Sequence, residues 1–110
     1  MSSNTNTADQ KKIVRILGIG QFSIDNDVLN ELNEIDNGIV RLLENKENDN
    51  QVHLKFQSQL QLLETIVKQK GTAVDSKEIV TSDIILPGKD ITLEEARNVF
   101  KGEGIIQDTY

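Results

Sequence analysis

The chain has 110 residues, 36% of them hydrophobic, and a formal net charge of −6, so it is long enough for one domain with one core. The absence of cysteine excludes disulfides, thiol nucleophiles and cysteine-ligated zinc. No run approaches the roughly 20 apolar residues that would cross a bilayer. We therefore expect a soluble, cytoplasmic protein that does not insert directly into membranes.

Three parts of the chain differ in composition. Residues 1–12 are polar and rich in Ser, Thr and Asn, so we expect a disordered leader there. A single domain should occupy residues 13–106, and residues 107–110 should form a flexible tail.

Residues 13–24 predict a β-hairpin. Two apolar runs flank Gly18 and Gly20, which allow a sharp reversal of the chain. A dinucleotide-binding loop would need a third glycine that opens a helix directly after the first strand, whereas Gln21 and Phe22 continue an extended run. We expect Phe22, like Phe56 and Phe100, to lie in the core.

The clearest predicted helix follows. Asp25 is suited to its N-cap, and apolar residues then recur at alternating spacings of four and three. These positions are Val28, Leu32, Ile35, Ile39 and Leu42, with Leu29, Val40 and Leu43 on the flanks. The pattern predicts a helix packed on a domain. Gly38 interrupts it, which indicates a close backbone crossing or a bend.

This region also holds the excess charge. Residues 25–50 carry eight acidic and two basic residues, which accounts for the entire net charge of −6. Such a surface repels phosphate backbones and anionic lipids, so we expect no nucleic-acid partner. A basic protein partner would fit it. An ordinary solvated helix face explains the charge equally well.

A second helix should begin near Asn48 and end at Gly71, a residue suited to a left-handed cap. Its apolar stripe consists of Val52, Phe56, Leu60, Leu63 and Val67. With a short loop between them, the two helices predict an antiparallel helical hairpin. His53 lies off the stripe, without a second His or any Cys to share a metal, so we expect it to be neither a ligand nor a catalytic base.

The remaining elements are shorter. An apolar run within residues 78–88 ends at a Pro-Gly pair and predicts a strand or an extended segment. Thr92 and Glu95 form a capping box for a third helix, which Gly102 ends. The fold class expected is α+β: a small β-hairpin, to which residues 105–106 could add a strand, packed on the helical hairpin and the short third helix.

Three pieces, in this order, resemble the phage shock protein A-associated (PspAA) family. They are residues 13–22 (IVRILGIGQF), residues 29–37 (LNELNEIDN), and residues 82–87 (SDIILP) followed by 92–95 (TLEE) and 102–106 (GEGII). The motif residues within them are Gly18, Gly20, Gln21, Phe22, Ser82, Leu86, Pro87, Thr92 and Glu95. The chain departs from the family pattern in its polar leader, at Gly38, and at Thr81, where a proline is expected.

The resemblance implies an accessory protein of the envelope-stress system built around phage shock protein A, a coiled-coil, membrane-remodelling relative of ESCRT-III proteins. It supplies no catalytic residues. The sequence agrees, because it has no Ser-His-Asp set and its carboxylates lie on a solvated helix without an apolar pocket to separate their pKa values. We therefore expect neither an enzyme nor a cofactor or metal site.

Our leading hypothesis is a non-enzymatic interaction module. Its acidic first helix would contact a coiled-coil partner through Glu31, Asn33, Glu34 and Asp36, modulate the partner's assembly, and reach the membrane periphery through that partner. Asn33 and Asp36 lie one helical turn apart, where they could instead clamp residues 81–86 inside the domain.

Two alternatives remain at this point. The Gly18/Gly20 turn, beside Arg15 and Gln21, could form a nest for an anion or a nucleotide, which would make the protein a small-ligand sensor. The broad apolar face of the first helix could also hold together a homo-oligomeric structural adaptor.

Overall fold

The computed structural model describes residues 11–46, 48–78, 80–102 and 104–106. Its elements, in chain order, are β1 (Lys12–Ile16), β2 (Gly20–Ile24), α2 (Asn26–Glu44), α3 (Asp49–Lys70), β3 (Thr72–Ala73), β4 (Ile84–Leu86) and α4 (Leu93–Val99). The predicted α+β class is confirmed. Residues 1–10 of the expected leader and the expected tail at 107–110 lie outside the described residues, and Lys12 already belongs to β1.

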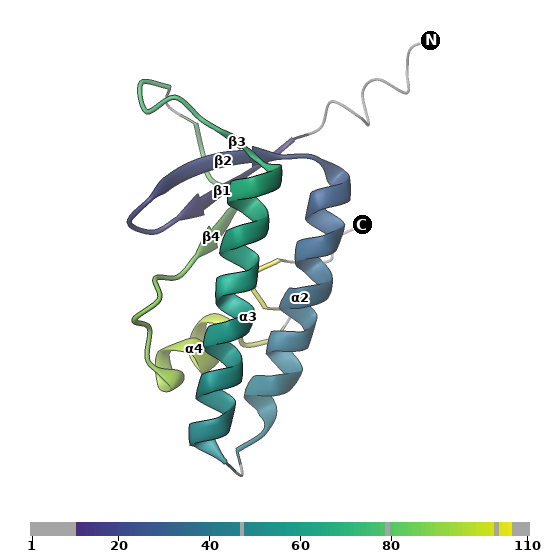
Figure 1. Cartoon of the computed structure of the whole chain (residues 1–110), viewed down its shortest axis with the longest axis vertical. Helices are drawn as coiled ribbons and strands as arrows, with labels where there is room; N and C mark the ends of the chain where they lie inside the picture. Colours follow the sequence, from purple (N-terminus) through teal and green to yellow (C-terminus); the bar gives the residue numbers. More distant parts are fainter. Residues whose placement is uncertain (1–10, 47, 79, 103, 107–110) are drawn as a thin grey trace.

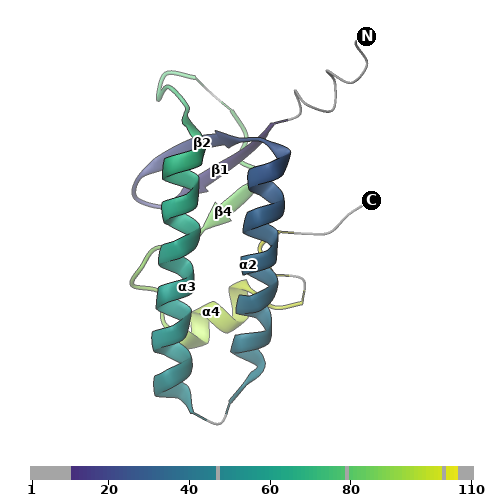
Figure 2. The same cartoon turned by 45° about the vertical axis from the view of Figure 1, so that its right-hand side comes forward.

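The two long helices stand side by side as an antiparallel pair, the sheet lies across one end of them, and α4 crosses behind them (Figures 1 and 2). Each helix begins at the residue that the sequence indicates. The Asp25 carboxylate accepts a hydrogen bond from Val28 N at 3.0 Å, and the Asn48 side chain caps α3. The capping box of Thr92 and Glu95 at the start of α4 is also confirmed.

The sheet has four strands in the order β3-β2-β1-β4. β1 and β2 form the predicted antiparallel hairpin, in which Ile16 lies opposite Gly20. Its turn has Gly18 at φ +86° and Gly20 at φ +149°, and Ile19 N donates to Ile16 O at 2.9 Å. A side chain would be strained at both φ values, so glycine suits both positions.

The predicted strand at 105–106 is wrong. The strand that joins the hairpin is β4, which pairs in parallel with β1 and places Ile85 opposite Arg15. Residues 105–106 form a bend instead. They have no place beside β1, because β4 occupies that edge and Asp83 N donates to Ile13 O at 2.8 Å. The sequence also did not indicate β3, which pairs with β2.

Two glycines behave differently from expectation. Gly71 ends α3 as predicted, but its φ of −87° is not left-handed. It is required by close approach: a Cβ there would lie 2.6 Å from Val67 O and 3.2 Å from Ser23 O. Of the two expectations for Gly38, the close backbone crossing is wrong, because a Cβ there would meet nothing within 4 Å, and the bend stays a prediction.

One continuous core joins the sheet to the helices. Phe56 and Phe100 are fully buried and meet edge to face, with ring centroids 5.6 Å apart, whereas Phe22 is half-buried at the edge of the core. The other buried apolar residues are Val14, Ile16, Ile24, Val28, Leu32, Ile39, Leu43, Val52, Leu60, Leu63, Ile66, Val67, Ile84, Leu86, Ala96 and Ile106.

Arg97 ties α4 to the loop between the long helices. Its Nε donates to Leu43 O, and its Nη2 donates to both Asn45 O and Asp49 Oδ1, each at 3.1 Å. The guanidinium therefore satisfies carbonyls at the C-terminal end of α2, where cations are favoured. This contact closes the helical hairpin at the end remote from the sheet.

Candidate partner-binding surface

The outward stripe of α2 is acidic. Asp27, Glu34 and Arg41 are exposed and recur at seven-residue intervals, which places them along one side of the helix, and Glu44 is exposed one turn beyond. Asp27, Glu34 and Glu44 form no ion pair within the described residues. We call these three residues the α2 acidic stripe. Its carboxylates are exposed to solvent, with the exposed Arg41 between Glu34 and Glu44.

Glu31 lies beside this stripe and is half-buried. Its Oε1 is 2.9 Å from Lys70 Nζ at the end of α3. An exposed pair of this kind contributes only about 0–1 kcal/mol. A cationic partner could therefore displace Lys70 from Glu31 at small cost.

Asp36 is not part of the exposed surface. Its side chain is fully buried, and its two carboxylate oxygens accept hydrogen bonds from Ile105 N at 3.1 Å and Ile106 N at 3.0 Å. Gly104 fits against the carboxylate, because a Cβ there would lie 2.5 Å from both oxygens. The Asp36 side chain is therefore not exposed for the predicted partner contact.

The predicted clamp is present but holds a different segment. Asp36 fastens residues 104–106 rather than 81–86, because the C-terminal residues, not β4, return along this flank of α2. Asn33, one turn earlier, is half-buried. Of the four residues predicted to contact a partner, only Glu34 is exposed, while Glu31 and Asn33 are half-buried and Asp36 is buried.

The motif residues around the hairpin have structural roles. The segment between β3 and β4 must cross from one edge of the sheet to the other. Gln21 Nε2 holds this crossover by donating to Val80 O at 3.1 Å and to Ser82 Oγ at 2.8 Å. Asp83 Oδ2 accepts from Ile13 N at 2.8 Å. Hydrogen bonds of β2 and β1 to this segment therefore position β4.

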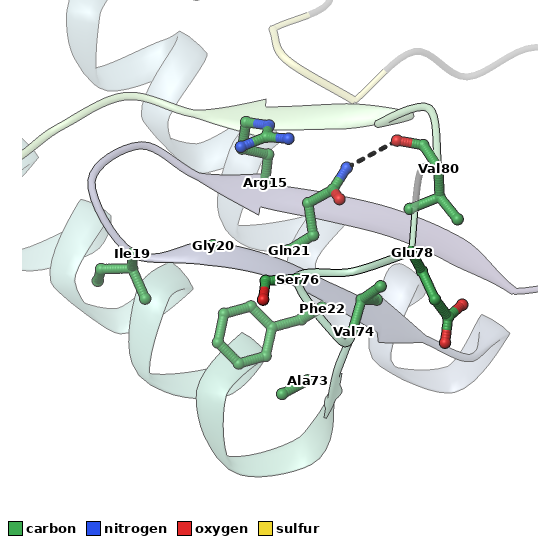
Figure 3. Close-up of a pocket in the computed structure, with 10 residues that line it drawn as sticks. All are labelled: Arg15, Ile19, Gly20, Gln21, Phe22, Ala73, Val74, Ser76, Glu78 and Val80. Atoms are coloured by element: carbon green, nitrogen blue, oxygen red, sulfur yellow. Dashed lines mark hydrogen bonds between the residues drawn. The ribbon is translucent and has the colours of Figure 1, made fainter.

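A cavity of about 420 Å³ lies between the hairpin and the crossover segment (Figure 3). It brings together Arg15, Gly20 and Gln21, as the small-ligand alternative requires, but Gly18 does not line it. Both amide hydrogens of Gln21 are used in the crossover bonds. Glu78 also lines the cavity. One guanidinium and one carboxylate leave no net positive charge, which disfavours phosphate binding.

The apolar face of α2 packs against the hydrophobic core of its own chain. Val28, Leu32, Ile39 and Leu43 are buried. The flanking Leu29, Ile35, Val40 and Leu42 are half-buried against the core. The surplus apolar surface that would favour a homo-oligomeric adaptor is therefore not found on this helix.

The part of the chain that the structure describes contains no group of three His, Cys, Asp or Glu side chains that could hold a metal. None of its helices has both the length and the hydrophobicity needed to span a bilayer. The pKa of Glu95 is lowered by hydrogen bonds from the backbone and side chain of Thr92, which reflects helix capping rather than catalysis.

Comparison with known proteins returns one family. Searches among curated proteins and among solved structures give no match. A family model described as PspA-Associated protein (PspAA) matches residues 12–108, which cover the hairpin, the three helices and the clamped segment at 104–106. The chain belongs to the PspA-associated protein family.

Proposed function

We propose that this protein is a non-enzymatic accessory protein that binds a PspA-type coiled-coil protein through the α2 acidic stripe. Family membership supports an accessory role in a PspA-type system. The observation that carries the binding mode is the α2 acidic stripe itself, whose three carboxylates are exposed and have no internal ion pairs among the described residues.

The shape of α2 suits a helical partner. The helix has 19 residues, which corresponds to about 28 Å at the usual rise. Asp27 and Glu34 are seven residues apart and Glu44 follows ten residues later, so these carboxylates can face Lys or Arg side chains on a helix laid alongside. Such pairs mainly set orientation and association rate. The partner's basic helix face would then be covered.

By covering the partner's basic helix face, α2 would change how the partner assembles. A coiled-coil protein assembles by packing helix faces on one another. If a face is occupied by α2, it cannot contact the next copy of the partner, so assembly would be altered. We place this action in the cytoplasm, with the protein brought to the membrane periphery by its partner.

A capture experiment with purified PspA-type partner tests the proposal. The variant Asp27→Asn, Glu34→Gln, Glu44→Gln neutralises the stripe with little change in side-chain size. The control Gln57→Lys, Gln61→Lys, Gln69→Lys changes the net charge by the same amount on exposed positions of α3. Three exposed pairs at about 0.5 kcal/mol each predict a roughly tenfold loss of affinity for the first variant.

The control should bind like the unmodified protein. Equal capture of all three forms would refute the role of α2, and no capture of any form would refute the partnership. Asp36 is left unchanged, because its burial would confuse lost binding with lost folding.

A further inference from the structure

A second surface, formed by other elements than the α2 acidic stripe, has the character of a docking site. Six large apolar side chains are exposed among the described residues, and four of them belong to the hairpin, β4 and α4. These four are Leu17, Ile19, Ile85 and Val99, with exposed fractions of 49%, 50%, 50% and 43%. We call them the hairpin patch.

The four residues are neighbours in the fold. Leu17 N donates to Leu86 O at 3.2 Å, which places the start of the hairpin turn beside the end of β4. Ile85 lies opposite Arg15 in the register of β4 and β1. Leu17 and Val99 line the same groove, of about 500 Å³, between the hairpin, the loop after β4 and α4. Leu17 therefore lies between Val99, which lines the same groove, and the exposed face of the sheet that carries Ile85, while Ile19 follows Leu17 in the hairpin turn.

The four side chains of the hairpin patch are not part of the hydrophobic core. On β1 and β4 the alternate residues Val14, Ile16 and Leu86 are at most 1% exposed and fill the core. The positions between them face away, and in a sheet with one solvated face such positions are normally polar. Apolar residues at Leu17 and Ile85 break this alternation. Exposed apolar side chains grouped in this way mark an interaction site.

Charge on the patch restricts the partner. Arg15 is exposed beside Ile85 and forms no ion pair within the described residues, in a protein whose net charge is −6. The groove itself is lined by two exposed acidic residues, Asp90 and Glu95. A complementary surface presents a carboxylate to Arg15, a cation to Asp90 and Glu95, and apolar side chains to the patch.

A helix fits this surface better than a strand. β4 has only three residues and is followed directly by Pro87, so it offers a poor edge for strand addition. The groove has both apolar and acidic lining residues, which suits an amphipathic helix that places apolar side chains along one face and charged ones beside them. We propose that the hairpin patch docks an amphipathic helix of a partner protein, whose apolar stripe enters the groove and whose carboxylate pairs with Arg15.

The probe for this proposal is a fluorescently labelled, synthetic amphipathic helix of about 20 residues, with a leucine stripe bordered by one glutamate and one lysine. Its binding to the full chain is measured by fluorescence anisotropy. The variant Leu17→Ser, Ile85→Ser should weaken binding at least about tenfold, because it removes two apolar anchors. The control Leu54→Ser, Leu62→Ser removes two exposed leucines of α3 and should bind normally.

A charge swap separates specific docking from general hydrophobic attraction. Arg15→Glu should weaken binding of the glutamate peptide, and a peptide with lysine in place of that glutamate should restore it. Circular dichroism verifies that each variant is folded. The proposal is overturned if the unmodified chain binds no peptide, if the α3 control loses as much affinity, or if the lysine peptide gives no rescue. A dimer in light scattering that the Leu17→Ser, Ile85→Ser variant dissociates would also overturn it, since a second copy would then cover the patch.

Discussion

Asp36 shows how one buried side chain can determine the course of a terminal segment. Its carboxylate holds two backbone N–H groups of residues that lie about 70 positions further along the chain. Such charge-assisted bonds to a buried acceptor are stronger than neutral ones. A residue on an acidic helix thus serves the fold, while Glu34, two positions earlier, faces solvent.

We predict that Asp36→Ala lowers the free energy of unfolding by about 2–4 kcal/mol, because it leaves the Ile105 and Ile106 amides without an acceptor in a buried site. Urea denaturation measures this change. Glu34→Ala, on the same helix but exposed, should change stability by less than about 0.5 kcal/mol. Equal stability of the two variants would contradict the clamp.

At the scale of elements, contacts at the ends of the helices fix how the helices are oriented. α2 and α3 begin at the side-chain caps Asp25 and Asn48, and Arg97 joins α4 to the loop between them. At the other end of α3, Gly71 lets the last turn approach β2. The two long helices are therefore fixed at both ends, once by α4 and once by the sheet.

Two glycine substitutions should change the folding stability in opposite directions. Gly71→Ala puts a Cβ 2.6 Å from Val67 O, so we expect a loss of about 1–3 kcal/mol of stability from overpacking. Gly38→Ala, in open space within α2, should add about 0.5–1 kcal/mol, because alanine favours helix over glycine. Thermal and urea unfolding of the pair provide the measurement, and stabilisation by both changes would show that the approach at Gly71 is not tight.

At the scale of the whole molecule, the two proposed surfaces differ in physical character. The α2 acidic stripe offers solvated carboxylates, whose attraction for a partner is screened by salt. The hairpin patch offers apolar area, whose burial depends little on moderate salt. The chain could therefore contact two helices at once, or one partner at two places.

Salt should reveal which surface dominates capture of a PspA-type partner. If the α2 acidic stripe carries the binding, raising NaCl from about 50 mM to about 500 mM should weaken binding of the unmodified chain several-fold. The Asp27→Asn, Glu34→Gln, Glu44→Gln variant should show a much flatter salt dependence. Isothermal titration calorimetry gives both affinities. Identical salt curves for the two forms would indicate that the stripe takes no part.

Local features were predictable because short stretches of chain specify them. The spacing of apolar residues predicted both long helices, Asp25 and the Thr92/Glu95 pair marked helix starts, and Gly18 and Gly20 marked the hairpin turn. The motif resemblance likewise indicated the family that the model match at residues 12–108 confirms. The helix, cap and turn signals each lie within one element, whereas the family resemblance combines three short pieces spread over residues 13–106.

Contacts between distant segments were decided by tertiary structure alone. Composition could not tell that Asp36 meets residues 104–106, that β4 rather than 105–106 joins β1, or that a side chain at Gly71 would collide with Val67 O and crowd β2. These features depend on which surfaces meet once the core has formed, and the same residue types would permit other pairings. By itself the sequence determined the helices, the turn and the place of the excess charge. Packing decided which acidic side chains face solvent. Asp36 and Glu34 are both acidic residues of α2, but the fold buries Asp36 and leaves Glu34 exposed.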